Sequence, residues 1–149
     1  PIKAAFPEAI VDGAVSREAL KRLIATDSAV LDRLEAIVHP LVAADRKVFL
    51  AASTEDIVVF DVPLLFETRA QGEFDSVLVV TVPLQVQKDR VLSRPDMTDA
   101  HFSAILRRQM PDAEKRRRAD HVIETLSMEA TRNDVRRLIG ELRERRAHA

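Results

Sequence analysis

The order of apolar and polar positions predicts a helical first part of the chain. Apolar residues at helical spacing follow Ser16 and Asp27, two residue types that cap helices. The first apolar face consists of Ala19, Leu20, Leu23 and Ile24, and the second of Val30, Leu31, Leu34, Ile37 and Val38. Because Pro40 disfavours helical geometry at His39, we expect a corner there, with a new helical segment over about 41–52.

The second part of the chain alternates between two kinds of pattern. Short apolar runs predict strands at 57–62, 77–82 and 121–124, and helical patterns lie at about 84–93, 99–110, 111–118 and 128–145. Strands separated by helices pair in parallel through right-handed crossovers. The pattern therefore indicates an α/β fold, with residues 1–56 as a possible helical subdomain beside the sheet.

Composition narrows the class of protein. The chain of 149 residues is long enough for one domain with its own core. It contains no cysteine, which excludes disulfides, a thiolate nucleophile and Cys-ligated zinc, and its four histidines have no ligand spacing. No apolar stretch approaches the roughly 20 residues of a membrane helix. We therefore expect a soluble protein of the cytoplasm, without a membrane partner.

Charge is balanced overall but unevenly distributed. The net charge is −1, yet basic residues are concentrated at 107–118 and near the end of the chain. Such clusters are typical of nucleic-acid binding, but a base-stacking platform would need more aromatic residues than six Phe, without Trp or Tyr. We expect solvated helix faces, including Lys115, and no nucleic-acid partner.

The run Asp61-Val62-Pro63-Leu64-Leu65-Phe66-Glu67 is the most informative segment of the chain. It follows the apolar residues 57–60, and a carboxylate at the carboxyl end of a buried strand lies where open α/β sheets bind ligands. The segment predicts a small-molecule site. No Gly-x-x-x-x-Gly-Lys-Ser/Thr loop accompanies it, because the three glycines are widely separated.

Five ordered motifs together make the chain resemble the dephospho-CoA kinase family over nearly its whole length. They are Leu34-Glu35-Ala36-Ile37-Val38-His39-Pro40-Leu41-Val42; the run 61–67; Val79-Val80-Thr81-Val82 with Gln87, Arg90 and Arg94; Ile105, Gln109 and Lys115; and Ala119-Asp120-His121-Val122-Ile123. The His-Pro and Pro-Leu-Leu-Phe-Glu pieces are the most specific. The chain departs from the family at Glu124-Thr125-Leu126-Ser127, where relatives often carry Asn and Gly near the adenine pocket.

The resemblance implies a three-layer parallel sheet of the P-loop kinase type, with helical substrate-binding and lid segments. It divides the chain into an acceptor-side subdomain, 1–56, and a partial kinase core, 57–149, with a lid-like insertion at about 88–118. The family's first strand, its Gly-rich phosphate loop and an Asp-x-Asp segment would precede Pro1. We therefore expect a fragment of a longer enzyme, inactive by itself, that phosphorylates the ribose 3′-hydroxyl of dephospho-CoA from ATP with Mg²⁺.

The resemblance also implies roles for individual residues. Arg90 and Arg94, one turn apart on a helix, correspond to lid arginines that close on ATP phosphates, or else they pair with nearby aspartates. Asp61 is expected to hold Mg²⁺ or to cap the next turn. Glu67 is expected to bind substrate hydroxyls or to anchor its loop to a lid arginine. Four further residues are expected at the acceptor, or to have structural roles instead: His39, Leu64, Leu65 and Phe66.

Three alternative functions remain open at the level of the sequence. One is a different P-loop nucleoside or nucleotide kinase. Another is a non-catalytic binding module that retains the acceptor and lid elements. The third is a basic RNA-binding domain, which titration with dephospho-CoA and RNA would distinguish from the others.

Overall fold

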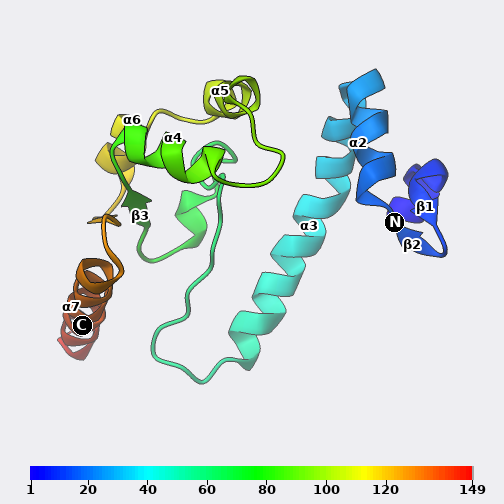
Figure 1. The fold of residues 1–149 in the computed structure, drawn as a ribbon. Coiled ribbons are helices and arrows are strands. Elements are labelled where there is room, and N and C mark those ends of the chain that lie inside the picture. The colour runs from blue at the N-terminus through cyan, green and yellow to red at the C-terminus, as the bar shows by residue number, and fades with distance from the viewer. Residues whose placement is uncertain (149) are drawn as a thin grey trace. The chain divides into compact units, whose positions relative to one another are not determined.

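A computed structural model describes residues 1–148 and separates them into two units, which meet in the sequence between Val59 and Phe60 (Figure 1). Each unit is internally packed. The predicted division at residue 56, with its acceptor-side and lid-like parts, stays a prediction.

The N-terminal unit begins with elements that the hydrophobic pattern did not reveal. Helix α1 (Ile2–Ala5) and the 3₁₀ turn η1 (Pro7–Ala9) precede an antiparallel hairpin of β1 (Ile10–Val11) and β2 (Ala14–Val15). Asp12 and Gly13 form its turn, with φ angles of 51° and 79°. Asp-Gly suits a two-residue hairpin turn because both residues tolerate positive φ.

Helix α2 (Arg17–Thr26) begins where the sequence predicts it. The Ser16 hydroxyl oxygen accepts a 3.2 Å hydrogen bond from the Ala19 amide. The predicted apolar face of α2 packs against a buried cluster of Phe6, Ala9, Ala19 and Val30, to which Ile2, Ala5, Leu20, Leu23, Ile24, Leu34 and Ile37 add partly buried side chains. This cluster is the core of the unit.

Helix α3 (Ala29–Ala52) runs without interruption through Pro40, so the predicted corner at His39-Pro40 is wrong (Figure 1). Proline removes one donor to the carbonyl of Ala36, which lies at an exposed position where water can satisfy it. The start of the helix differs by one residue. Ser28 is the N-cap without a side-chain bond, and Asp27 Oδ1 accepts from the Ala29 amide at 2.9 Å.

The strand predicted at 57–62 does not form among the described residues. This segment is irregular and lies beside no paired strand, and Val59 is 82% exposed. A strand exists only with a neighbour that accepts and donates its backbone hydrogen bonds, so apolar character alone does not produce one. Phe60 instead packs near Phe74, with ring centroids 6.0 Å apart.

The C-terminal unit contains the parallel sheet that the alternation predicts. Strand β3 (Leu78–Thr81) pairs with β4 (His121–Glu124) in register Leu78↔His121 to Thr81↔Glu124. The elements between and around them are η2 (Gln71–Glu73), α4 (Leu84–Leu92), α5 (Asp99–Arg108), α6 (Asp112–Arg118) and α7 (Met128–Ala147). The α/β class is confirmed, with two strands in this sheet among residues 60–148.

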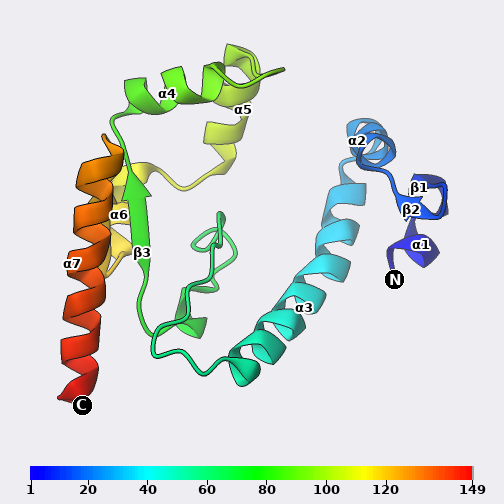
Figure 2. The same cartoon turned by 60° about the horizontal axis from the view of Figure 1, so that its bottom comes forward.

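Four helices of this unit lie beside the sheet or beyond its end. Helix α6 contacts β3, and α7 contacts β4, whereas α4 and α5 contact each other past the carboxyl end of β3 (Figure 2). The most buried side chains of the unit are those of Phe66, Val77, Thr81, Phe102 and Ile123. Within residues 1–148, every helix is too short or too polar to cross a membrane.

Candidate functional site

Residues 63–69 form a series of turns closed by Thr68. Its hydroxyl donates to the Leu64 carbonyl at 2.8 Å, and its amide donates to the same oxygen at 3.0 Å. The Ala70 amide donates to the Leu65 carbonyl at 3.0 Å, and Arg69 adopts a positive φ of 58°. These bonds give the predicted acceptor segment a defined shape, which we call the acceptor turn (residues 63–69).

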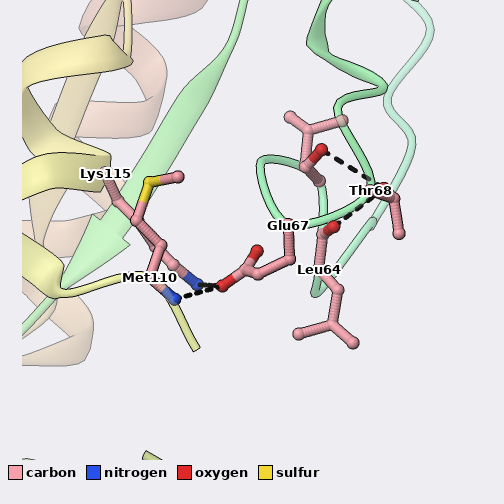
Figure 3. Close-up of polar contacts among 6 residues, drawn as sticks. Leu64, Glu67, Thr68, Met110 and Lys115 are labelled. Atoms are coloured by element: carbon pink, nitrogen blue, oxygen red, sulfur yellow. Dashed lines mark hydrogen bonds and ion pairs between the residues drawn. The ribbon is translucent and has the colours of Figure 1, made fainter. Parts of the chain in front are cut away.

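Glu67 ties the acceptor turn to the start of α6 (Figure 3). Its Oε1 lies 2.8 Å from Lys115 Nζ and accepts a 2.7 Å hydrogen bond from the Met110 amide. The side chains of Glu67 and Lys115 are each 17% exposed. The second oxygen, Oε2, is buried and has no partner among the described residues. Glu67 is therefore an anchor in this structure, and its cationic partner is a lysine rather than an arginine.

Two opposing effects set the pKa of Glu67. Burial, the largest single effect, raises the pKa, but it is outweighed by the hydrogen bonds from Lys115, the Met110 amide and the amide of Glu67 itself, together with the positive charge of Lys115. The pKa of Glu67 consequently lies below its ordinary value. Glu67 is an ionised carboxylate at neutral pH, and its charge is neutralised locally by one ammonium group.

The apolar residues of the acceptor turn differ in exposure. Phe66 is 5% exposed and Leu64 is 42% exposed, while Leu65 is intermediate. Phe66 is thus buried, whereas Leu64 exposes apolar surface to solvent. The structural role expected as one alternative fits the burial of Phe66, and the expected contact with the acceptor stays a prediction for Leu64 and Leu65.

Arg90 and Arg94 do not share one helix. Helix α4 ends at Leu92, and Arg94 lies two residues beyond, immediately before Pro95. Proline moves the residue that precedes it out of helical geometry, which explains the early end. Arg90 Nη2 donates to the Leu126 carbonyl at 3.3 Å and so connects α4 with the loop after β4. The Arg94 side chain is exposed.

His39 and Asp61 are both exposed. His39 lies inside α3 in the N-terminal unit and not at the predicted corner, whereas Asp61 belongs to the C-terminal unit. Among residues 1–148, no group of three or more His, Cys, Asp or Glu side chains is arranged to hold a metal ion. The seven predicted residues from 61 to 94 share one unit, and His39 stands in the other.

The carboxyl end of β3 is fixed by two polar contacts that the sequence analysis missed. The buried Thr81 hydroxyl donates to Asp112 Oδ1 at 2.8 Å, and the Thr125 amide donates to the Thr81 carbonyl at 2.8 Å. At the opposite end of the strand, Asp120 Oδ2 accepts from the Val77 amide at 2.8 Å. Thr81 and Asp120 both occur in the recognised motifs, and this is the feature of the sequence that could have indicated their structural roles.

Lys115 is the residue for which the sequence interpretation is wrong. A solvated surface position was expected for it, yet its side chain is largely buried and paired with Glu67. Arg107, Arg108 and Arg116 are exposed, as expected. Lys115 belongs to the recognised motif with Ile105 and Gln109, and this was the only hint that it differs from the neighbouring arginines.

Comparison with known proteins gives consistent matches along the chain. The family model described as dephospho-CoA kinase matches residues 1–130. The dephospho-CoA kinase of Cereibacter sphaeroides is 55% identical over 144 residues, covering 97% of this chain and 73% of that protein. That of Ruegeria pomeroyi is 48% identical, covering 100% of this chain and 76% of the relative, and that of Mesorhizobium japonicum is 51% identical, covering 97% and 76%.

A solved structure shares the fold. The crystal structure of TT1252 from Thermus thermophilus matches with a TM-score of 0.80 and 36% identity, covering 95% of this chain and 74% of that one. Fold and motifs define a kinase of the α/β class, a transferase that uses ATP. The chain belongs to the dephospho-CoA kinase family.

Proposed function

We propose that the protein transfers the γ-phosphoryl group of ATP to the ribose 3′-hydroxyl of dephospho-CoA, giving coenzyme A and ADP. The observation that carries this proposal is the family match over residues 1–130, together with relatives that are about half identical and are named for this activity. The acceptor turn supports it because binding residues are often on loops positioned by a scaffold, and this turn is tethered to α6 through Glu67.

The acceptor turn is proposed to receive dephospho-CoA. Leu64 offers exposed apolar surface, Leu65 is partly exposed, and the buried Phe66 is proposed to support the turn by packing. Glu67 contributes to the acceptor site by fixing the turn to α6 through Lys115 and Met110. His39, exposed on α3, is proposed to contact the substrate phosphate when it is bound.

Arg90 and Arg94 are proposed to bind the ATP phosphates. Phosphoryl transfer depends mainly on positioning and on positive charge around the transferring group. Arg90 already bonds the Leu126 carbonyl at 3.3 Å, so its guanidinium is held near the carboxyl end of β4. Arg94 lies beyond the end of α4, where its amide donates to the Val91 carbonyl at 3.1 Å, and its exposed side chain is proposed to approach the phosphates from a different direction.

Asp61 is proposed to hold Mg²⁺. Proteins bind this ion through one or two carboxylates, with waters and substrate phosphates completing the shell, so a single exposed aspartate can supply the protein ligand. Mg²⁺ bound there would neutralise charge on the phosphates. We also propose that the protein acts in the cytoplasm, as the absence of cysteine favours.

The test is a panel of phosphoryl acceptors offered to the full reading frame that encodes residues 1–149. Equal concentrations of dephospho-CoA, adenosine, AMP and pantetheine phosphate are incubated with ATP and Mg²⁺, and each product is identified by mass spectrometry. We expect phosphorylation of dephospho-CoA alone. Preference for AMP or adenosine would make the protein a different nucleotide or nucleoside kinase, and binding of dephospho-CoA without turnover would make it a binding module.

A further inference from the structure

Lys115 stands apart from the basic residues around it on α6. Arg117 and Arg118 pair with Glu114 on the same helix, and the Arg117 side chain is 75% exposed. Lys115 instead reaches from α6 to the acceptor turn and places its Nζ 2.8 Å from Glu67 Oε1, with both side chains 17% exposed. A largely buried pair between two segments far apart in the sequence constrains both of them.

Only one of the two carboxylate oxygens of Glu67 has a hydrogen-bond partner among the described residues. Glu67 Oε1 accepts from both Lys115 and the Met110 amide, but Oε2 is buried without a partner. A buried carboxylate with one unsatisfied oxygen depends strongly on the cation that remains. Without the ammonium, Glu67 must take up a proton or turn towards water, and either change alters the segment to which it belongs.

Helix α6 connects this ion pair to the sheet. Its first residue, Asp112, accepts a 2.8 Å hydrogen bond from the buried hydroxyl of Thr81 at the end of β3. Lys115 lies three residues later on the same helix. The acceptor turn is therefore connected through α6 to the end of a strand, at the edge of the sheet where α/β proteins bind ligands.

We propose that Lys115 is a positioning residue for the phosphoryl acceptor: through Glu67, it holds residues 63–69 in the conformation that binds dephospho-CoA. The inference rests on the proposed function and adds to it a residue that does not touch the substrate. The inference treats the two substrates separately: the residues assigned to ATP lie on and just after α4, where Arg90 bonds the Leu126 carbonyl, whereas Lys115 bonds Glu67 of the acceptor turn.

The experiment compares three variants of the full reading frame with the parent enzyme. Lys115→Met keeps an unbranched apolar stem and removes the ammonium, Lys115→Arg keeps a cation, and Arg117→Met is the matched control on an exposed position of the same helix. We expect Lys115→Met to raise KM for dephospho-CoA about tenfold or more, with KM for ATP and kcat little changed. Lys115→Arg should recover part of the loss, and Arg117→Met should resemble the parent.

Two readouts make the outcome decisive. Equal KM for dephospho-CoA in Lys115→Met and Arg117→Met, or an equal rise in KM for both substrates, would overturn the inference. Backbone amide resonances of residues 64–70 are recorded without ligand as the second readout. A shift confined to Lys115→Met supports the link to the turn, and no selective shift refutes it. An inactive parent enzyme would refute the proposed function, and the resonances would then decide the link alone.

Discussion

The hydroxyl of Thr81 and the carboxylate of Asp112 are joined by a 2.8 Å hydrogen bond that connects the last residue of β3 to the first residue of α6. Thr81 is 7% exposed, so its hydroxyl has little access to water. The bond fixes the helix that carries Lys115 relative to the strand end. The position of the acceptor turn thus depends on a contact outside the turn itself.

The first prediction concerns this bond. Thr81→Val keeps the shape of the side chain and removes the hydroxyl, which should lower the free energy of unfolding by about 1 kcal/mol. Thr131→Val is the control. The Thr131 hydroxyl donates to the Ser127 carbonyl, and that carbonyl also accepts a hydrogen bond from the Thr131 amide, so it keeps a partner when the hydroxyl is removed. Urea unfolding should show a clear loss for Thr81→Val and almost none for Thr131→Val; equal losses would argue against a special role for Thr81.

The second prediction compares two serine N-caps of the N-terminal unit. Ser16 accepts a hydrogen bond from the Ala19 amide, whereas Ser28 makes no side-chain capping bond. Ser16→Ala should therefore destabilise the protein by about 1 kcal/mol and Ser28→Ala by much less. Thermal unfolding followed by circular dichroism measures the difference, and a larger effect at Ser28 would contradict the capping geometry.

The third prediction is a dependence of stability on pH through Glu67. Its pKa in the folded protein lies below the ordinary value of 4.5, so the folded state releases this proton more readily than the unfolded chain. The resulting stabilisation is complete above pH 4.5 and is lost as the pH falls through the lower folded pKa.

Unfolding measured between pH 7 and pH 3 checks this sign. The parent protein should be more stable than Glu67→Gln at neutral pH, and the two should converge in acid. Glu55→Gln, at an exposed position, provides the control and should follow the parent throughout. A gap between parent and Glu67→Gln that widens in acid would show that Glu67 is stabilised in its protonated form instead.

The sequence predicts the fold well where local pattern and pairing agree. Strand β4 lies at the predicted residues, and β3 lies within the predicted range 77–82, because each has the other as a parallel partner. Residues 57–62 have the same apolar character without such a partner among the described residues, and they stay irregular. Strand formation depends on long-range pairing, which the run itself does not encode.

The errors in the helices and the site have different causes. Pro40 interrupts a backbone hydrogen bond but not α3, since the affected carbonyl is exposed. The Asp12-Gly13 turn was a readable hairpin signal that the strand analysis overlooked because its strands have only two residues each. The local pattern around Lys115 does not reveal its partner, because Glu67 lies 48 positions away in the sequence.

The fourth prediction tests the arginines assigned to ATP. In the full enzyme, Arg90→Ala or Arg94→Ala should reduce kcat by an amount equivalent to several kcal/mol of activation free energy, whereas stability should change by only about 0 to 1 kcal/mol. Arg107→Ala, on the exposed side of α5, is the control. Unchanged turnover of both variants at saturating ATP would contradict the proposed contact of Arg90 and Arg94 with the ATP phosphates.

The most direct test of the account is whether coenzyme A is formed. Residues 1–149 and the full reading frame that encodes them are each incubated with ATP, Mg²⁺ and dephospho-CoA, and the 3′-phosphate is identified by ³¹P NMR. We expect one coenzyme A per ADP from the full reading frame. We expect none from residues 1–149 alone, because they contain no Gly-x-x-x-x-Gly-Lys-Ser/Thr loop to hold the ATP phosphates. No 3′-phosphate from the full reading frame would contradict the proposed function, and turnover by residues 1–149 alone would contradict the expected need for that loop.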